Sequence, residues 1–91
     1  MKKIAVGEIR RIGVEVYSTT GADFEIDSAE YAVVNTVGET IKTGVPRIED
    51  KKITMLFNGA EIPTGQYNVI FTVSIADETL KFKVFVEVGK L

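Results

Sequence analysis

The strongest constraint on the fold of this chain is an alternation of apolar and polar residues in two consecutive C-terminal segments. Successive side chains of a strand point to opposite faces, so a period of two predicts paired strands that bury one face. The residues expected to face inward are Tyr67, Val69, Phe71, Val73 and Ile75, followed by Leu80, Phe82, Val84, Val86 and Val88. The chain is therefore expected to be an all-β domain.

A β-hairpin closed at Asp77-Glu78 joins these two segments in the expected fold. It places Ile75 opposite Leu80 and Tyr67 opposite Val88, so that inward residues meet inward residues along its length. A slip of one residue would turn one apolar set toward solvent, so the pairing of faces is strongly specified.

The outer face of this hairpin carries an apolar pair among polar neighbours. The expected register sets Ile70 opposite Phe85, and Lys81 and Lys83 lie on the same face. Two apolar residues on an otherwise solvated face form a small hydrophobic patch that favours contact with another surface. Either a neighbouring loop covers the pair, or these four residues form an interface with a partner.

Upstream of the hairpin, the same periodicity predicts further short strands separated by turn signals. They fall at 12–16, 24–26, 31–37, 40–43 and 53–57. Segment 31–37 is apolar on both faces and is expected to be central in its sheet. Pro46 marks an edge because proline cannot donate to a ladder, and Leu56 marks either a bulge or the opposite face. About seven strands without a helical period predict a two-sheet antiparallel sandwich, with a small barrel as the competing architecture.

Length and composition limit the remaining choices. The 91 residues are enough for one domain, 1–91, and 45% hydrophobic with 26% charged residues is typical of a globular chain. The sequence has no cysteine, which excludes a disulfide scaffold, and its net charge of −2 gives no general attraction for nucleic acid. No run approaches the roughly 20 apolar residues of a membrane span, so no membrane or nucleic-acid partner is expected.

The N-terminus begins like a secretion signal, with Lys2 and Lys3 before a short apolar run. Gly7 and Glu8 interrupt that run, as do the following arginines, so no signal peptide is expected. The location stays unknown from the sequence: the cytoplasm and a virion are both compatible with it, and the absence of cysteine is also compatible with many Gram-positive surface domains.

The sequence contains few of the residue types that commonly act in catalysis. The absence of histidine and cysteine excludes serine-histidine and cysteine-histidine catalysis and the usual zinc ligands. No phosphate-binding glycine motif and no N-glycosylation acceptor is present. Only carboxylate chemistry remains, and an enzyme is the least supported class.

One acidic cluster merits comparison with a calcium site. Asp23, Glu25 and Asp27 would project from one strand face, with Asp50 or Asp77 as contributors from neighbouring loops. A strand spaces such side chains about 7 Å apart, whereas one Ca²⁺ ion takes 6–8 close oxygens. A solvated strand face is the favoured interpretation, and no cofactor is expected.

Two further groups have both a structural and a functional interpretation. Basic residues occur near the N-terminus, including Arg10 and Arg11. We expect these residues and the two hairpin lysines to hinder aggregation through exposed strand edges. Tyr17 and Phe85 are outward aromatics that could stack on a sugar or anchor a partner. Single exposed aromatics are common, so a structural role is favoured.

The run from Pro63 to Val69, followed by two alternating strands, resembles the last strands of immunoglobulin-like and fibronectin-like domains. In those domains a tyrosine at the start of the penultimate strand bonds back to the backbone, forming the tyrosine corner. The resemblance implies this role for Tyr67, immediately after Gly65 and Gln66. No counterpart of the immunoglobulin disulfide or its tryptophan is present, so only the wider sandwich group is implied.

The chain is also similar to small sandwich domains of phage and prophage structural proteins. The shared features are an early strand with Ala29 and Tyr31, a turn at Gly38, and a late strand with Gly65 and Tyr67. This resemblance implies a virion component or an accessory of one.

The function expected from the sequence is a non-enzymatic structural or protein-interaction module. Its candidate interface is the outer hairpin face with Ile70, Phe85, Lys81 and Lys83, and its expected partner is a protein or a weak homo-oligomer. The alternative is a carbohydrate-binding or calcium-dependent adhesion module.

Overall fold

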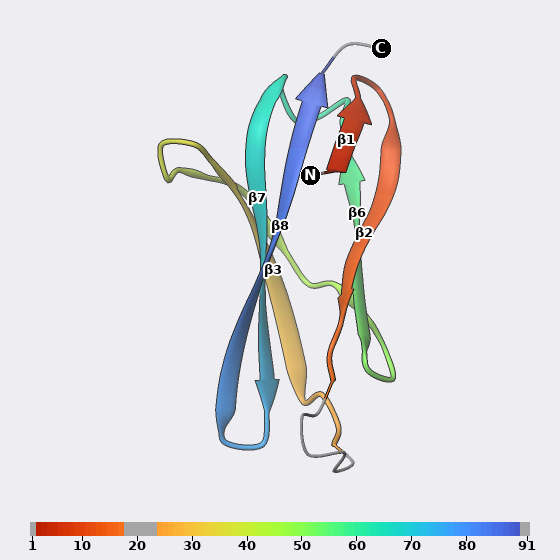
Figure 1. The fold of residues 1–91 in the computed structure, drawn as a ribbon, viewed down its shortest axis with the longest axis vertical. Coiled ribbons are helices and arrows are strands. Elements are labelled where there is room, and N and C mark those ends of the chain that lie inside the picture. Colours follow the sequence, from red (N-terminus) through yellow and green to blue (C-terminus); the bar gives the residue numbers. More distant parts are fainter. Residues whose placement is uncertain (1, 18–23, 90–91) are drawn as a thin grey trace.

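The computed structural model describes residues 2–17 and 24–89, which form eight β-strands in two sheets and no helix (Figure 1). In chain order the strands are β1 (Lys2–Ala5), β2 (Ile9–Glu15), β3 (Ser28–Asn35), β4 (Thr40–Gly44), β5 (Arg47–Glu49), β6 (Lys52–Asn58), β7 (Gly65–Ile75) and β8 (Glu78–Gly89). The larger sheet has the order β1-β8-β7-β3-β4, and the smaller has the order β2-β6-β5. All pairs are antiparallel except β1 with β8, which is parallel. The expected all-β class is confirmed, with eight strands rather than about seven.

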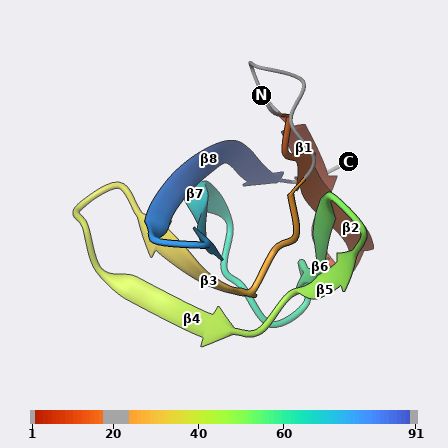
Figure 2. The same ribbon diagram turned by 90° about the horizontal axis from the view of Figure 1, so that it is seen from below.

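The two sheets enclose one core. Val33 and the inward residues of β7 from the larger sheet share a single buried cluster with Ile12, Ile53 and Phe57 of the smaller sheet. The chain leaves the larger sheet from β1 to β2 and from β4 to β5, and it returns from β2 to β3 and from β6 to β7 (Figure 2). Pro46 lies between β4 and β5, which are both edge strands, as the proline predicts. The described strands therefore form a sandwich of two sheets.

The β7–β8 hairpin has the expected faces and a different register. Its loop is Ala76-Asp77, so Ile75 lies opposite Glu78 and not opposite Leu80. The shift from the predicted alignment is two positions, and side chains alternate with a period of two, so inward residues still meet inward residues. The predicted direct pair of Ile70 with Phe85 is wrong for the same reason.

A residue from outside the hairpin contacts its loop. The Asp27 N–H donates to the carbonyl oxygen of Ser74 at 2.9 Å, and Asp27 Oδ2 accepts a bond from the Ala76 N–H at 2.9 Å. Ala76 has φ 53°, in a region that costs a residue with a Cβ about 1–2 kcal/mol. The carboxylate of Asp27 therefore holds the loop in a conformation that its own residues do not favour.

Other differences from the expected strands lie upstream. The short strands β1 and β5 were not predicted, and the predicted strand at 24–26 is an irregular segment whose Phe24 and Ile26 pack half-buried against the core. β3 is central, as expected, and ends at Asn35, whose Oδ1 accepts bonds from the N–H groups of residues 37 and 39. Leu56 points outward from β6, whose pairing with β2 is continuous, so it marks no bulge.

The structure contains the expected bond from the Tyr67 hydroxyl to upstream backbone. Tyr67 is 6% exposed, and its hydroxyl donates to the carbonyl oxygen of Pro63 at 2.6 Å. Gly65 has φ +150°, and a Cβ at this position would lie 3.5 Å from the Tyr67 hydroxyl. The ring thus closes the connection between β6 and β7 against the start of β7.

Candidate interaction face on the larger sheet

The larger sheet has an outer face, turned away from the smaller sheet, on which three neighbouring strands form ordered rows. One row crosses β3, β7 and β8 through Val34, Asn68 and Phe85. The next rows are Ala32, Ile70 and Lys83, then Glu30, Thr72 and Lys81. These rows bring residues that are more than 30 positions apart in the sequence into direct contact range.

The apolar members of these rows form what we call the outer-face patch: Ala32, Val34, Ile70 and Phe85. Phe85 is 42% exposed, and the other three residues are half-buried. Phe85 lies opposite Asn68 and Ile70 lies opposite Lys83, so the two apolar residues are diagonal neighbours. No loop in the described ranges removes Phe85 from solvent.

Exposed lysines flank the outer-face patch. Lys81 and Lys83 project from β8 on the outer face, and the exposed Glu30 stands at the far end of the row of Lys81. Among the residues that the structure describes, none of these three takes part in an ion pair. The face therefore presents an apolar centre with opposite charges on its two sides.

Asn68 lies in the middle of the patch with an unpaired polar atom. Its Oδ1 is buried and has no hydrogen-bond partner within the described residues. Leaving a buried acceptor unpaired costs about 1–3 kcal/mol, and most such groups in native proteins are paired. A donor from outside the monomer would remove this cost.

The sequence identified only half of the patch. Ile70 and Phe85 were expected on the outer face, where they do lie, but Ala32 and Val34 were expected only to mark β3 as a central strand. Their apolar character on the second face of segment 31–37 is the signal that locates them. Asn68 and Glu30 carry no such signal, because polar residues are normal on an outer strand face.

The acidic residues considered for calcium do not gather in the described structure. Asp23 lies outside the described residues, Glu25 is exposed in the irregular segment, and Asp27 is bonded to the hairpin loop. Asp50 lies in the turn between β5 and β6, and Asp77 in the β7–β8 loop. The described residues contain no group of three or more side chains of the metal-binding kinds.

The two outward aromatics belong to different sheets. Tyr17 follows β2 of the smaller sheet and is 77% exposed, whereas Phe85 projects from β8 of the larger sheet. A hydrogen bond with Glu15, together with the negative charge of its carboxylate, raises the pKa of Tyr17. The pair does not make one platform for stacking on a sugar.

The N-terminal basic residues lie on edge strands. Lys2 and Lys3 belong to β1, at one edge of the larger sheet, and Arg10 and Arg11 belong to β2, at one edge of the smaller sheet. Arg10 pairs with Glu8 at 3.6 Å, and Arg11 donates to Thr54 Oγ1 at 2.9 Å. Charges at these places hinder edge-to-edge pairing with other chains.

An open hollow of about 360 Å³ adjoins the outer face beside Glu30 and Thr72. Its lining also includes Tyr31 and Ala32 of β3, the end of β4 and Val45, and Glu30 is the only carboxylate among the described lining residues. Glycoside hydrolysis commonly uses a pair of acids, of which the described lining supplies one.

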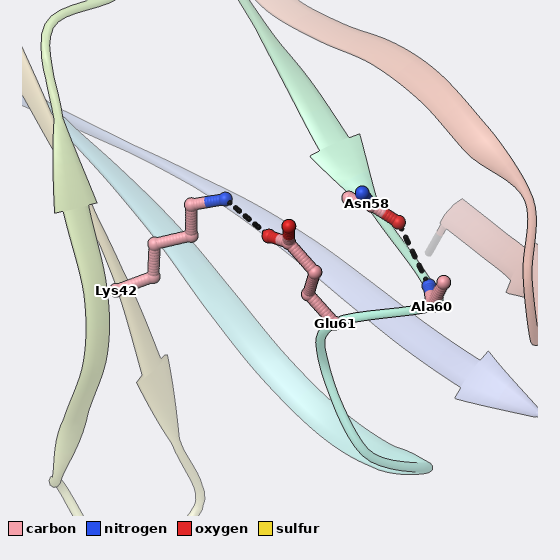
Figure 3. A network of polar contacts seen from close by, with 4 residues as sticks. All are labelled: Lys42, Asn58, Ala60 and Glu61. Atoms are coloured by element: carbon pink, nitrogen blue, oxygen red, sulfur yellow. Dashed lines mark hydrogen bonds and ion pairs between the residues drawn. The ribbon is translucent and has the colours of Figure 1, made fainter.

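The seam between β4 and the connection from β6 to β7 is closed by an ion pair. Lys42 Nζ donates to Glu61 Oε2 at 3.0 Å, and Asn58 Oδ1 accepts a bond from the Ala60 N–H at 2.9 Å (Figure 3). The hydrogen bond to Glu61 raises the pKa of Lys42. These contacts position the connection that also carries Pro63, the acceptor of the tyrosine corner.

Comparison with known proteins gives no match to a protein-family model and none to a curated protein. Within the described residues, no helix is long and apolar enough to span a membrane.

Proposed function

We propose that this chain is a non-enzymatic structural or protein-interaction module that binds a partner through the outer face of its larger sheet. The observation that carries this proposal is the outer-face patch, in which exposed Phe85 and half-buried apolar neighbours surround the unpaired Oδ1 of Asn68. An exposed apolar patch is better stabilised in a complex than in water.

We further propose that the domain is an immunoglobulin-like sandwich. The strand order supports this: β3, β7, β8 and β4 occupy the places of strands C, F, G and C′, and β2, β6 and β5 those of B, E and D. Tyr67 stands near the start of β7, the place of the tyrosine corner in strand F. With the sequence features around Ala29, Gly38 and Gly65, this favours a phage or prophage virion component, or an accessory of one, as the setting.

The energetics favour a modest affinity. Removing Phe85 and Ile70 from water contributes a few kcal/mol at roughly 25 cal/mol per Å² of apolar area. Association costs translational and side-chain freedom, which offsets much of that gain. The module is therefore expected to associate weakly, or to have a dedicated partner that adds contacts around the patch.

Replacing Phe85 by serine tests the proposed interface. Phe85→Ser should weaken binding at least fivefold and leave the unfolding midpoint nearly unchanged, because the side chain lies outside the core. Binding is measured on immobilised wild-type chain against itself and against the products of the neighbouring genes. Phe82→Ser is the matched control: this phenylalanine lies on the same strand and packs against the core, so its loss should destabilise the fold. Equal binding by the wild-type and Phe85→Ser chains would contradict the proposal.

A further inference from the structure

We infer that the partner of the outer face is a second copy of this chain, bound face to face about a twofold axis that runs parallel to β7. This inference rests on the proposed function, since it uses the same face. It adds the identity of the partner and the arrangement of the two copies. The rows that cross β3, β7 and β8 are self-complementary under this rotation.

A twofold axis along β7 exchanges the positions of β3 and β8 between the two copies, because these strands lie on either side of β7. Within each row, the β8 residue of one copy then faces the β3 residue of the other. In the row of Glu30, Thr72 and Lys81, the Lys81 ammonium of each copy faces the Glu30 carboxylate of the other copy. The dimer therefore contains two such contacts. Neither group has an ion-pair partner among the described residues of the monomer.

The apolar residues match under the same operation. Phe85 of one copy faces Val34 of the other, and Ile70 lies on the axis against its own counterpart. Ala32 faces the aliphatic stem of Lys83, which covers apolar surface while its charge stays in water. All four residues of the outer-face patch are thus in apolar contact.

Asn68 also lies on the axis. Its side chain faces the Asn68 side chain of the second copy, and an amide group offers both two donors and one acceptor oxygen. Packed sheets lie about 10 Å apart, a gap that two facing asparagine side chains bridge with one hydrogen bond.

A twofold axis across the strands is the competing arrangement. It would place β8 over β8 and, centred on Phe85, would pair Lys83 with Glu87 of the second copy. Glu87 Oε2 already accepts a bond from Gln66 at 3.4 Å, and Glu87 lies beside Lys3 of β1. That axis also sets Ile70 against a polar glutamine, so the axis along β7 fits the surface better.

Exchanging the charges of Glu30 and Lys81 tests the arrangement. Self-association of the full chain is measured by sedimentation velocity at concentrations up to about 1 mM, the range in which weak complexes form. Glu30→Lys and Lys81→Glu should each weaken self-association at least fivefold, since each places like charges face to face. A mixture of the two variant chains should associate at least as well as the wild type, because opposite charges then meet at both contacts. Lys52→Glu, an exposed position on β6 of the smaller sheet, is the control and should change nothing.

The outcomes separate this inference from the proposed function. A wild-type chain that stays monomeric overturns the second-copy inference, whereas the proposed function stands if Phe85→Ser still abolishes binding to another protein. If a mixture of Lys83→Glu and Glu87→Lys chains restores self-association, and the mixture of Glu30→Lys and Lys81→Glu chains does not, the axis along β7 is wrong. Self-association that is unchanged by Phe85→Ser overturns the inference and argues against the interface itself.

Discussion

At the scale of the residue, Tyr67 shows how one hydroxyl organises a connection. Its ring is buried, and its bond to the Pro63 carbonyl oxygen is 2.6 Å long, so the residue fixes the chain four positions upstream. This role of Tyr67 was expected from the resemblance of residues 63–69 to the last strands of immunoglobulin-like and fibronectin-like domains. Ala76 is the contrasting case, since its positive φ depends on Asp27, which is 49 positions away.

Removing the Tyr67 hydroxyl should measurably weaken the fold. Tyr67→Phe keeps the buried ring and loses one hydrogen bond, so the free energy of unfolding should fall by about 1 kcal/mol, measured by urea denaturation. Tyr17→Phe is the matched control, because that ring is 77% exposed, and it should give no measurable change. A loss at Tyr17 equal to that at Tyr67 would show that the corner bond contributes nothing particular.

At the scale of the element, β1 is a short strand with a large structural role. Its four residues pair in parallel with the last part of β8, and Ile4 enters the core at 2% exposure. A four-residue segment holds too few alternating positions to be identified as a strand from periodicity. The tertiary structure makes it an edge of the larger sheet, where each of its residues pairs with a residue of β8 that lies 84 positions later in the chain.

Truncating the buried isoleucine tests how much β1 contributes. Ile4→Ala should lower the free energy of unfolding by about 2–5 kcal/mol, because it removes buried methyl groups and leaves a cavity. Ile9→Ala on β2 makes the same chemical change at a side chain that is 58% exposed, and it should cost less than about 1 kcal/mol. Thermal unfolding of both variants gives the comparison, and similar midpoints would mean that β1 is not part of the cooperative fold.

At the scale of the whole molecule, one core joins the two sheets, and an ion pair crosses the seam between them. The Lys42–Glu61 pair links β4 of the larger sheet to the connection that leaves β6 of the smaller one (Figure 3). The side chains are 34% and 61% exposed, so solvent screens the pair, and its contribution is about 0.5 kcal/mol.

The raised pKa of Lys42 gives this contribution a defined pH dependence. A lysine whose pKa is higher in the folded state adds stability below its ordinary value of 10.5, and loses it as the pH rises through the folded value. The difference in unfolding free energy between wild type and Lys42→Met should therefore be constant at neutral pH and shrink above about pH 10.5. Arg47→Met removes a cation that does not titrate in this range, so its difference should not change in the same way. A constant difference for Lys42→Met would contradict the assignment.

The sequence alone determined the class of the fold and the two faces of its longest hairpin. Alternation in β7 and β8 assigns each side chain to a face, and an alignment shifted by two residues preserves that assignment. The central place of β3 and the edge at Pro46 also followed from local patterns, whereas the backbone bond of Tyr67 was expected from a resemblance carried by residues 63–69. These features depend on residues close together in the chain, where periodicity and turn chemistry act.

Only the tertiary structure decided the register of that hairpin, the pairing of β1 and the composition of the outer-face patch. The patch exists because β3 lies beside β7, which sets Ala32 and Val34 next to Ile70 and places Asn68 between Val34 and Phe85. Such adjacency results from packing a whole sheet over one core, and no pattern within a single strand encodes it. The charges that select a partner are distributed in the same way, with Glu30 and Lys81 in one row only because of the strand order.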